Sequence, residues 1–203
     1  DHDLRRSLGI NPDDHLMTYA GRIANEKNLD MLVEAWRRLS EHQDCHLLFV
    51  GDGPLRARLE SMNIPRTIFA GYRYGEELAS IYASSDLFVF PSLSETFGNV
   101  VLEAKASGLP VVAYNVQGPK DIVRDHHTGL LVDDITPQAL AVAIKEMVSN
   151  RELMKQMGRQ ARAYAEGCTW EKIMGELRNQ YEEFTHTSQP EAAWRARANG
   201  SMA

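Results

Sequence analysis

The sequence predicts an α/β domain built on one sheet of about six parallel strands, with helices covering both faces. Short apolar runs alternate along the chain with longer segments whose apolar residues recur at helical spacing. The runs are apolar at most positions, as expected for strands of a parallel sheet that is covered on both faces. Hydrophobic residues make up 43% of the 203 residues and charged residues 25%, which suffices for a sizeable core.

The first half of the chain contains three strand–helix pairs. Each strand ends at or near a glycine, and we expect the strands at 15–21, 46–53 and 67–72. The following helices are expected at 28–40, 54–62 and 75–85. The first of these has its apolar residues along one face, and the second has a proline in its first turn, a favoured position.

The second half continues the alternation and then becomes helical. Strands are expected at 86–91, 110–114 and 129–132. Gly108 ends the helix between the first two, and the helices are expected at 98–107, 119–125, 136–149, 150–166 and 169–185. We expect one domain over residues 1–187. The polar, alanine-rich tail over residues 188–203 is expected to be a linker, a loosely held end or an appended sequence.

Composition excludes several classes of function. The net charge of −6 argues against a broad nucleic-acid-binding surface. No apolar run approaches the roughly 20 residues of a membrane span, and the polar, acidic start does not resemble a signal peptide. Cys45 and Cys168 lie far apart and match no metal-binding spacing, which suits a reducing compartment. We therefore expect a cytoplasmic location.

Ligands of parallel sheets bind beyond the carboxyl ends of the strands, so the residues after each strand are the candidates for a site. After the fourth strand, the stretch 90–110 has two glutamates, Glu95 and Glu103, on either side of Gly98. Backbone amides at the start of a helix favour phosphate, and glycine lets a ligand approach closely. Glu103 lies about 7 to 8 Å along that helix, a separation that suits the step from a diphosphate to a ribose.

The two glutamates also have a simpler interpretation. Glu95 then belongs to a polar loop, and Glu103 faces water beside Lys105. Local pattern alone does not separate these alternatives. A carboxylate within an apolar helical run is nevertheless expensive to bury without a partner, and two ribose hydroxyls would supply one.

Arg22 and Lys27 lie between the first strand and its helix, at the expected ligand edge. Two cations there can neutralise a diphosphate. The segment lacks the glycine spacing and the Gly-Lys-Ser/Thr ending of a P-loop. The simpler alternative is a solvated basic loop that pairs with Glu26.

Other polar residues after strands are expected to be structural. Asp52 is expected to cap the helix near Pro54, and Asp133 and Asp134 the helix near Pro137. The pair at 126–127, two histidines in a turn, has no third ligand nearby in sequence, so no metal site is expected.

Taken together, the motifs resemble a known family. In order along the chain, these are "GR…EKN", "GDGPLRARLE", "FAGY", "SETFGNVVLEAKASGLPVVA" and "TGLLV". They are similar to the C-terminal, nucleotide-sugar-binding half of the retaining GT-B glycosyltransferases of group 1 (family 4), over about Met17 to Asp134. The resemblance implies a single Rossmann-like domain, one half of a GT-B fold.

The resemblance also implies roles for residues. Arg22 and Lys27 match diphosphate-binding cations, and Glu95 matches the glutamate that contacts the hydroxyls of the donor sugar. These three are the implied catalytic residues, with Glu95 not assigned as a nucleophile. Glu103 matches the ribose ligand. The implied donor-binding set, including a base edge within 68–72, is Gly21, Arg22, Lys27, Phe69, Tyr72, Phe97, Gly98, Asn99, Val100 and Glu103. No metal or other cofactor is implied.

The implied reaction is transfer of a sugar from GDP-mannose or a UDP-sugar to an acceptor hydroxyl, with retention at the anomeric carbon. The acceptor, a lipid or glycan, would be held by an N-terminal domain that this chain lacks. The full-length protein would then contact the inner face of the membrane, and the isolated chain would be inactive or weakly active. The helix at 170–184 matches the segment that crosses back to that domain.

Two other functions stay open at this stage. One is a noncatalytic half-protein that binds a nucleotide sugar or a partner chain. The other is an epimerase or phosphorylase with a similar fold.

Overall fold

The fold is described from a computed structural model of the chain. The structure describes residues 2–39, 44–94 and 98–169, together with scattered positions between 172 and 182. The chain divides into two units, residues 1–166 and 167–203, and the fold below is that of the first. The expected boundary between residues 187 and 188 and most of the helix at 170–184, including Trp170, Ile173 and Leu177, lie outside the described residues.

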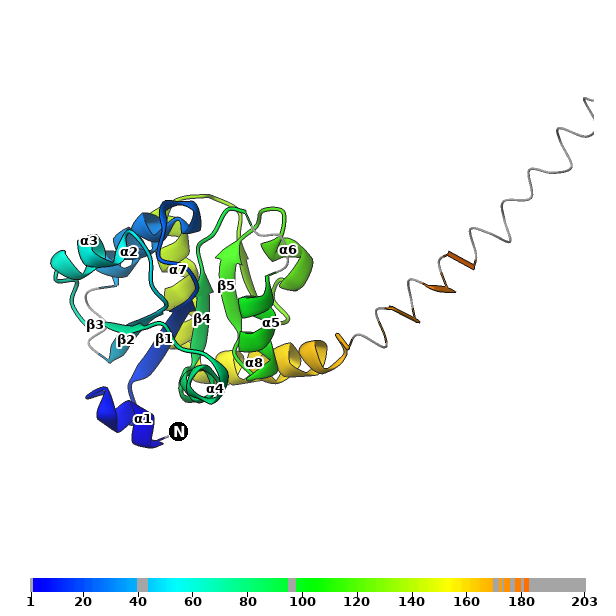
Figure 1. Cartoon of the computed structure of the whole chain (residues 1–203), viewed down its shortest axis with the longest axis horizontal. Coiled ribbons are helices and arrows are strands. Elements are labelled where there is room, and N and C mark those ends of the chain that lie inside the picture. The colour runs from blue at the N-terminus through cyan, green and yellow to red at the C-terminus, as the bar shows by residue number, and fades with distance from the viewer. Residues whose placement is uncertain are drawn as a thin grey trace, which may run out of the picture. The chain divides into compact units, whose positions relative to one another are not determined.

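The predicted sheet is confirmed. Six strands run parallel in the order β3-β2-β1-β4-β5-β6 (Figure 1). The strands are β1 His15–Ala20, β2 Cys45–Val50, β3 Thr67–Gly71, β4 Leu87–Phe90, β5 Val111–Tyr114 and β6 Gly129–Val132. Each lies within one or a few residues of its expected position.

The helices also follow the expected order, with two additions. The helices are α1 His2–Ser7, η1 Asn25–Lys27, α2 Leu29–Arg38, α3 Arg56–Ser61, α4 Gly75–Ser84, α5 Asn99–Ala106, α6 Pro119–Ile122, α7 Pro137–Ser149 and α8 Arg151–Glu166. The sequence did not predict α1 or the 3-10 turn η1. Both are short and lack the long apolar periodicity on which helix prediction depends.

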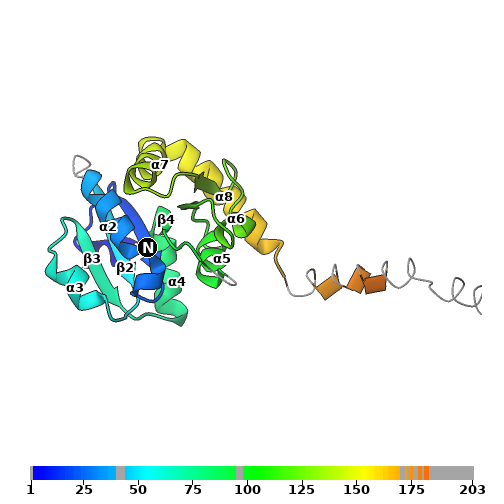
Figure 2. The same ribbon diagram turned by 90° about the horizontal axis from the view of Figure 1, so that it is seen from above.

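The side chains of each strand alternate between two cores, one on each face of the sheet. In β1, Met17 and Tyr19 belong to the core beneath α2 and α7, while Leu16 and Ala20 belong to the core beneath α4 and α5. Figure 2 shows α2 and α7 on one side of the sheet and α4 and α5 on the other. This alternation explains why the strands are apolar at nearly every position.

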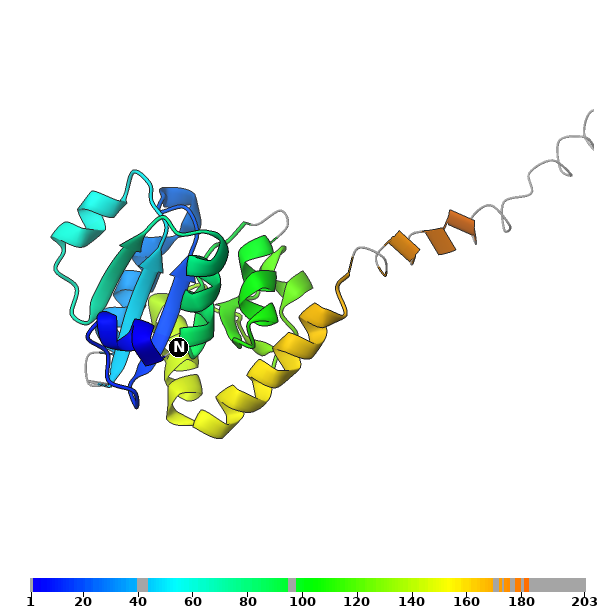
Figure 3. The same cartoon turned by 60° about the horizontal axis from the view of Figure 1, so that its bottom comes forward.

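Helix α8 joins the two faces. It begins beside α7, where Met154 and Met157 enter the first core, and then runs past α5 (Figure 3). Its close approach to the turn after α5 requires glycine, because a Cβ on Gly158 would lie 2.3 Å from the carbonyl oxygen of Gly108. The helix therefore fixes α5, and α5 borders the site described below.

The strand order reverses between β1 and β4. The chain runs outward through β2 and β3, returns to β4 beside β1, and then runs outward the other way. At such a point the segments after the two central strands leave on opposite faces and open a crevice at the carboxyl ends. Asn28 spans this crevice, since its side-chain amide donates to the carbonyl of Pro91 at 3.2 Å.

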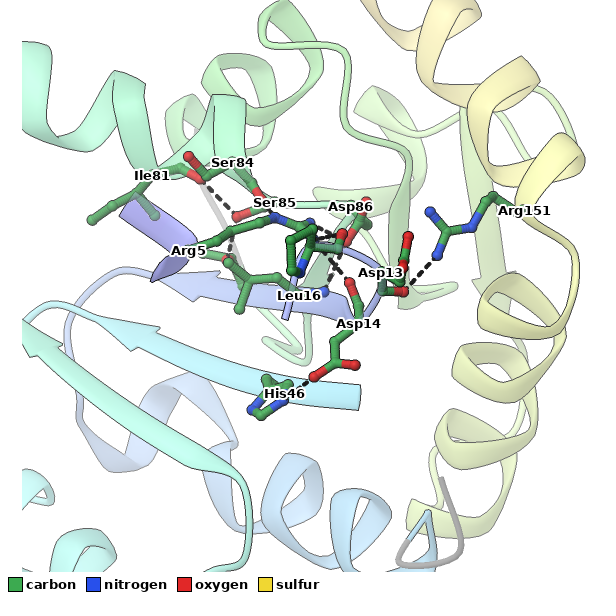
Figure 4. A network of polar contacts seen from close by, with 12 residues as sticks. Arg5, Asp13, Asp14, Leu16, His46, Ile81, Ser84, Ser85, Asp86 and Arg151 are labelled. Atoms are coloured by element: carbon green, nitrogen blue, oxygen red, sulfur yellow. Dashed lines mark hydrogen bonds and ion pairs between the residues drawn. The ribbon is translucent and has the colours of Figure 1, made fainter. Parts of the chain in front are cut away.

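At the opposite, amino edge of the sheet, Arg5 fastens α1 to the strands (Figure 4). Its guanidinium pairs with Asp86 and donates to the carbonyl oxygens of Ser84 and Asp14, both at 2.8 Å. Asp86 also accepts from the backbone N–H of Leu16 at 2.8 Å. This network ties α1, β1 and β4 together on the edge away from the crevice.

The expected cap of α7 is wrong. Thr136, rather than Asp133 or Asp134, precedes α7 and accepts from the N–H of Ala139 at 3.2 Å. Asp133 instead accepts from the side-chain amide of Asn115 at 2.7 Å. The two aspartates lie too far before the helix to reach its free N–H groups.

No described helix has both the length and the apolar character that crossing a membrane requires.

We expect Arg5→Ala to lower the free energy of unfolding by about 2 to 4 kcal/mol, because it leaves the half-buried Asp86 and two carbonyls without their cationic donor. Urea unfolding followed by circular dichroism measures the change. Arg38→Ala, which removes an exposed pair with Glu34, is the matched control and should shift stability by no more than about 0.5 kcal/mol. Equal effects of the two substitutions would show that Arg5 is not an anchor.

Candidate functional site

A cavity of about 460 Å³ opens at the carboxyl ends of β1, β2 and β3, against α4 and α5. This is the edge at which the sequence placed a site. The described residues that line it are Ala20, Gly21, Arg22, Val50, Gly51, Asp52, Tyr72, Arg73, Tyr74, Gly75, Leu78, Val100 and Glu103. Of the ten residues of the implied donor-binding set, the structure brings five together here, namely Gly21, Arg22, Tyr72, Val100 and Glu103.

The loops after β1 and β2 form one wall of the cavity by direct backbone contact. The N–H of Gly21 donates to Val50, and the N–H of Gly51 donates to Gly71, extending the strand ladder beyond the strand ends. A Cβ on Gly51, whose φ is +133°, would lie 2.0 Å from the carbonyl oxygen of Gly21. No side chain fits there, so the glycine is a requirement of this close approach.

Asp52 does not cap a helix, contrary to expectation. Its carboxylate accepts from the N–H of Gly53 at 2.7 Å and pairs with Arg56 at 3.2 Å. Helix α3 starts only at Arg56, two residues after Pro54, so the aspartate instead stabilises the turn before it.

The two candidate cations lie in different places. Arg22 lines the cavity, and its side chain is 66% exposed and pairs with Glu26 at 3.2 Å. This pair is the one that the simpler interpretation of the loop predicted. Lys27 ends η1, is partly buried and does not line the cavity. The hydroxyl of Tyr19 holds the loop by donating to the carbonyl of Arg22 at 2.8 Å.

Glu95 and Phe97 lie outside the described residues. The segment before them is held in place, because the buried hydroxyl of Ser92 donates to the carbonyl of Ser94 at 2.8 Å. After them, Gly98 precedes α5 with a left-handed backbone, φ 60° and ψ 31°, which glycine adopts without strain. Asn99 is exposed at the first position of α5, and neither Gly98 nor Asn99 is among the cavity-lining residues.

Glu103 combines features of both interpretations that the sequence left open. It is exposed, and its side chain also lines the cavity. The hydroxyl of Tyr82, on α4, donates to its Oε2 at 3.4 Å. Burial, followed by the nearby charge of Glu103, raises the pKa of Tyr82, so the phenol stays protonated at neutral pH.

Lys105 does not face water beside Glu103. It is fully buried, its ammonium donates to the carbonyl of Ile122, and it lies 3.2 Å from the ring centre of Tyr164 on α8. From the sequence, we expect a lysine to be exposed to solvent when it lies two residues after an exposed glutamate on a helix. The buried position depends on α8, whose packing against α5 local sequence does not reveal.

The expected base edge is split between core and cavity. Phe69 stacks on Phe49 with ring centres 5.0 Å apart and packs against the core, so its side chain does not line the cavity. Tyr72 and Tyr74 are about 70% exposed at the cavity wall, with ring centres 6.0 Å apart. Of the three tyrosines near the site, only Tyr72 was predicted. Tyr74 lies three residues after β3, and that position beyond a strand end was the available signal. The sequence held no local signal for Tyr82.

In the described part of the chain, no three His, Cys, Asp or Glu side chains lie close enough together to hold a metal ion.

Comparison with known proteins gives consistent results. The sequence model of the family described as "Glycosyl transferases group 1" matches residues 1–164. A GDP-mannose-dependent alpha-mannosyltransferase of Mycobacterium tuberculosis (strain CDC 1551 / Oshkosh) is 40% identical over 168 residues, covering 82% of this chain and 42% of that protein. The sulfoquinovosyl transferase SQD2 of Arabidopsis thaliana is 36% identical over 182 residues, covering 87% of this chain and 35% of that protein.

Among solved structures, a sucrose-phosphate synthase from Thermosynechococcus elongatus is similar with a TM-score of 0.76 and 30% identity. The match covers 93% of this chain and 50% of that chain. This chain therefore spans half or less of the length of these relatives.

We expect Gly51→Ala to lower the free energy of unfolding by about 3 to 5 kcal/mol, because it adds a steric clash with Gly21 to backbone strain. Gly9→Ala is the matched control, since Gly9 also has a positive φ, +71°, but open space around its Cβ. It should cost only the strain, about 1 to 2 kcal/mol. Urea unfolding of both variants tests this, and similar losses would contradict the close approach of the two loops.

Proposed function

This chain belongs to the group 1 glycosyltransferases, and we propose that it holds the nucleoside diphosphate sugar from which such an enzyme transfers a sugar. Its sheet of six parallel strands flanked by helices is one half of a GT-B fold, as the resemblance predicted. The proposed ligand is GDP-mannose or a UDP-sugar, and the proposed binding site is the cavity beside α5.

The proposal rests mainly on which of the charged residues around the cavity already have an ion-pair partner. Arg22, Asp52 and Arg73 line it, and each is already paired with a residue four positions along the chain, at 3.2, 3.2 and 3.8 Å. Among the described lining residues, Glu103 is the charged one that has no ion pair. A carboxylate kept without a cation at a cavity wall is suited to accept from ligand hydroxyls.

The position of Glu103 on α5 supports a ribose as its partner. It lies five residues after Gly98, so at about 1.5 Å per residue it is about 7 to 8 Å from the start of the helix. A diphosphate near that start would meet free backbone N–H groups and the positive end of the helix dipole. The ribose would then lie along the helix, beside Val100 and Glu103.

Arg22 and Lys27 are proposed to bind the diphosphate from the other side. The exposed pair of Arg22 with Glu26 is worth at most about 1 kcal/mol, whereas charge-assisted bonds of a guanidinium to phosphate oxygens are stronger. Exchange of Glu26 for the ligand is therefore favourable. As the bond to the sugar breaks, the diphosphate gains charge, and the same cations would stabilise it.

The remaining features of the reaction are proposals from the family. Glu95 would contact sugar hydroxyls, and transfer would retain the anomeric configuration without a bound metal. The acceptor, a lipid or glycan, would be bound by a part of the protein outside this chain, from which any contact with the inner face of a membrane would come. Alone, the chain would bind donor in the cytoplasm with little or no transfer. The mannosyltransferase among the relatives favours GDP-mannose.

Isothermal titration of the chain with GDP, UDP and GDP-mannose tests the assignment of the cavity. Glu103→Ala should weaken binding of the preferred nucleotide about tenfold or more, because it removes the acceptor of charge-assisted hydrogen bonds from ribose. Glu34→Ala, which removes an exposed helix carboxylate away from the cavity, is the control and should bind as wild type. No binding of any of the three ligands at millimolar concentration would contradict the proposal.

Arg22→Ala and Lys27→Ala separately test the diphosphate site. Each should weaken GDP or UDP about tenfold or more and leave binding of the free nucleoside unchanged, since the lost contacts are to phosphate. Arg38→Ala serves as the matched cation control. If Lys27→Ala binds as wild type while Arg22→Ala does not, the lysine is excluded from the site.

A further inference from the structure

Tyr82 reaches the carboxylate of Glu103 from the buried side of α4. The side chain is 2% exposed and belongs to the same core cluster as Val101 and Ala104 of α5. Its ring meets the ring of Phe88 edge-on, with centres 5.9 Å apart and an interplanar angle of 72°. Because the ring is enclosed by the core, its hydroxyl is held in a fixed position beside the carboxylate of Glu103.

The direction of this hydrogen bond is set by protonation. The raised pKa of Tyr82 keeps the phenol protonated, so it donates and Glu103 accepts, at 3.4 Å from Oε2. A hydroxyl that is buried and loses its acceptor is costly, which favours the side-chain conformation of Glu103 that keeps the contact. Within the described residues, this is the one hydrogen bond that the side chain of Glu103 makes.

We propose that Tyr82 is a positioning residue for ribose recognition. It holds Oε2 of Glu103 from the protein side, so that Oε1 and the remaining lone pairs point into the cavity to accept from two ribose hydroxyls. This inference rests on the proposed function, because it assumes that Glu103 binds a ribose. Tyr82 itself does not line the cavity and acts through the glutamate.

The physical reason for such a residue is conformational entropy. An exposed glutamate on a helix samples many rotamers, and it must lose that freedom to accept from two hydroxyls at once. A rigid donor that already restricts the carboxylate lowers this loss. The restriction benefits a ligand with ribose hydroxyls and does nothing for a ligand that lacks them.

The test compares ribonucleotides with nucleotides that lack the hydroxyls. GDP, UDP and their 2′,3′-dideoxy forms are titrated into the full 203-residue chain. Tyr82→Phe removes only the hydroxyl and should reduce the preference for the ribonucleotide about threefold to tenfold. The whole reduction should come from weaker ribonucleotide binding, with dideoxynucleotide affinity unchanged.

Tyr114→Phe is the matched control for loss of a buried phenol. Its hydroxyl donates to the carbonyl of Thr136 at 3.1 Å, and it does not line the cavity, so the variant should lose stability but keep the wild-type preference. Thermal unfolding shows whether both tyrosine variants remain folded. A merely structural Tyr82 would resemble Tyr114 and leave the preference unchanged, which would overturn the proposal.

Glu103→Ala separates failure of the proposal from failure of the proposed function, because alanine leaves no acceptor for ribose hydroxyls. If Glu103→Ala abolishes the preference and Tyr82→Phe retains it, the role of Tyr82 is wrong and the ribose site stands. If Glu103→Ala retains the preference, Glu103 does not bind ribose, and the assignment on which the proposal rests is wrong.

Discussion

The backbone contact between Gly21 and Gly51 is the constraint on which the site depends. With no side chain between them, the loops after β1 and β2 lie against each other and continue the hydrogen-bonding ladder past the strand ends. This one wall of the cavity is therefore fixed by main-chain contacts. Arg22 and Asp52 directly follow these glycines, so the backbone contact fixes their positions. Both residues line the cavity.

Helix α5 is the second fixed element, and it is held from both faces. On one face Tyr82 of α4 meets Glu103. Two residues later Lys105 is buried against α6 and α8, where it donates to Ile122 and lies over the ring of Tyr164. Since a rotation of α5 would break both sets of contacts, the direction in which Glu103 points depends on α8 as much as on the cavity itself. A buried ammonium is costly to leave without a partner. The contacts of Lys105 therefore strongly favour the observed rotational position of α5.

The sequence was sufficient to predict the sheet, because strands buried on both faces are apolar at nearly every position, and the first three end at or directly before a glycine. It was also sufficient for the edge of the sheet at which the site lies, and for five residues that line the cavity. What it could not supply depends on contacts between distant segments. Lys105 was expected to be solvated. The helix that covers it, α8, is about 50 residues away in sequence, so the local pattern around Lys105 does not show its burial. Asp133 and Asp134 were assigned to a cap that Thr136, the residue directly before Pro137, provides. The stacking of the Phe69 ring on Phe49 was not predicted, since only the register between β2 and β3 reveals it.

The charges that line the cavity nearly cancel, and this limits how a diphosphate can be attracted. Two arginines and two carboxylates are among the described lining residues, and the whole chain carries a net charge of −6, so no broad positive field draws an anion in. In the proposed donor site, binding would instead come from local contacts, through the exchange of Glu26 for ligand at Arg22 and through the start of α5. Exposed pairs four residues apart are weak and quickly broken, so they keep the cations in place without competing strongly for them. If the cavity is the proposed donor site, it would favour a ligand that presents a diphosphate and a ribose together over one that presents either alone.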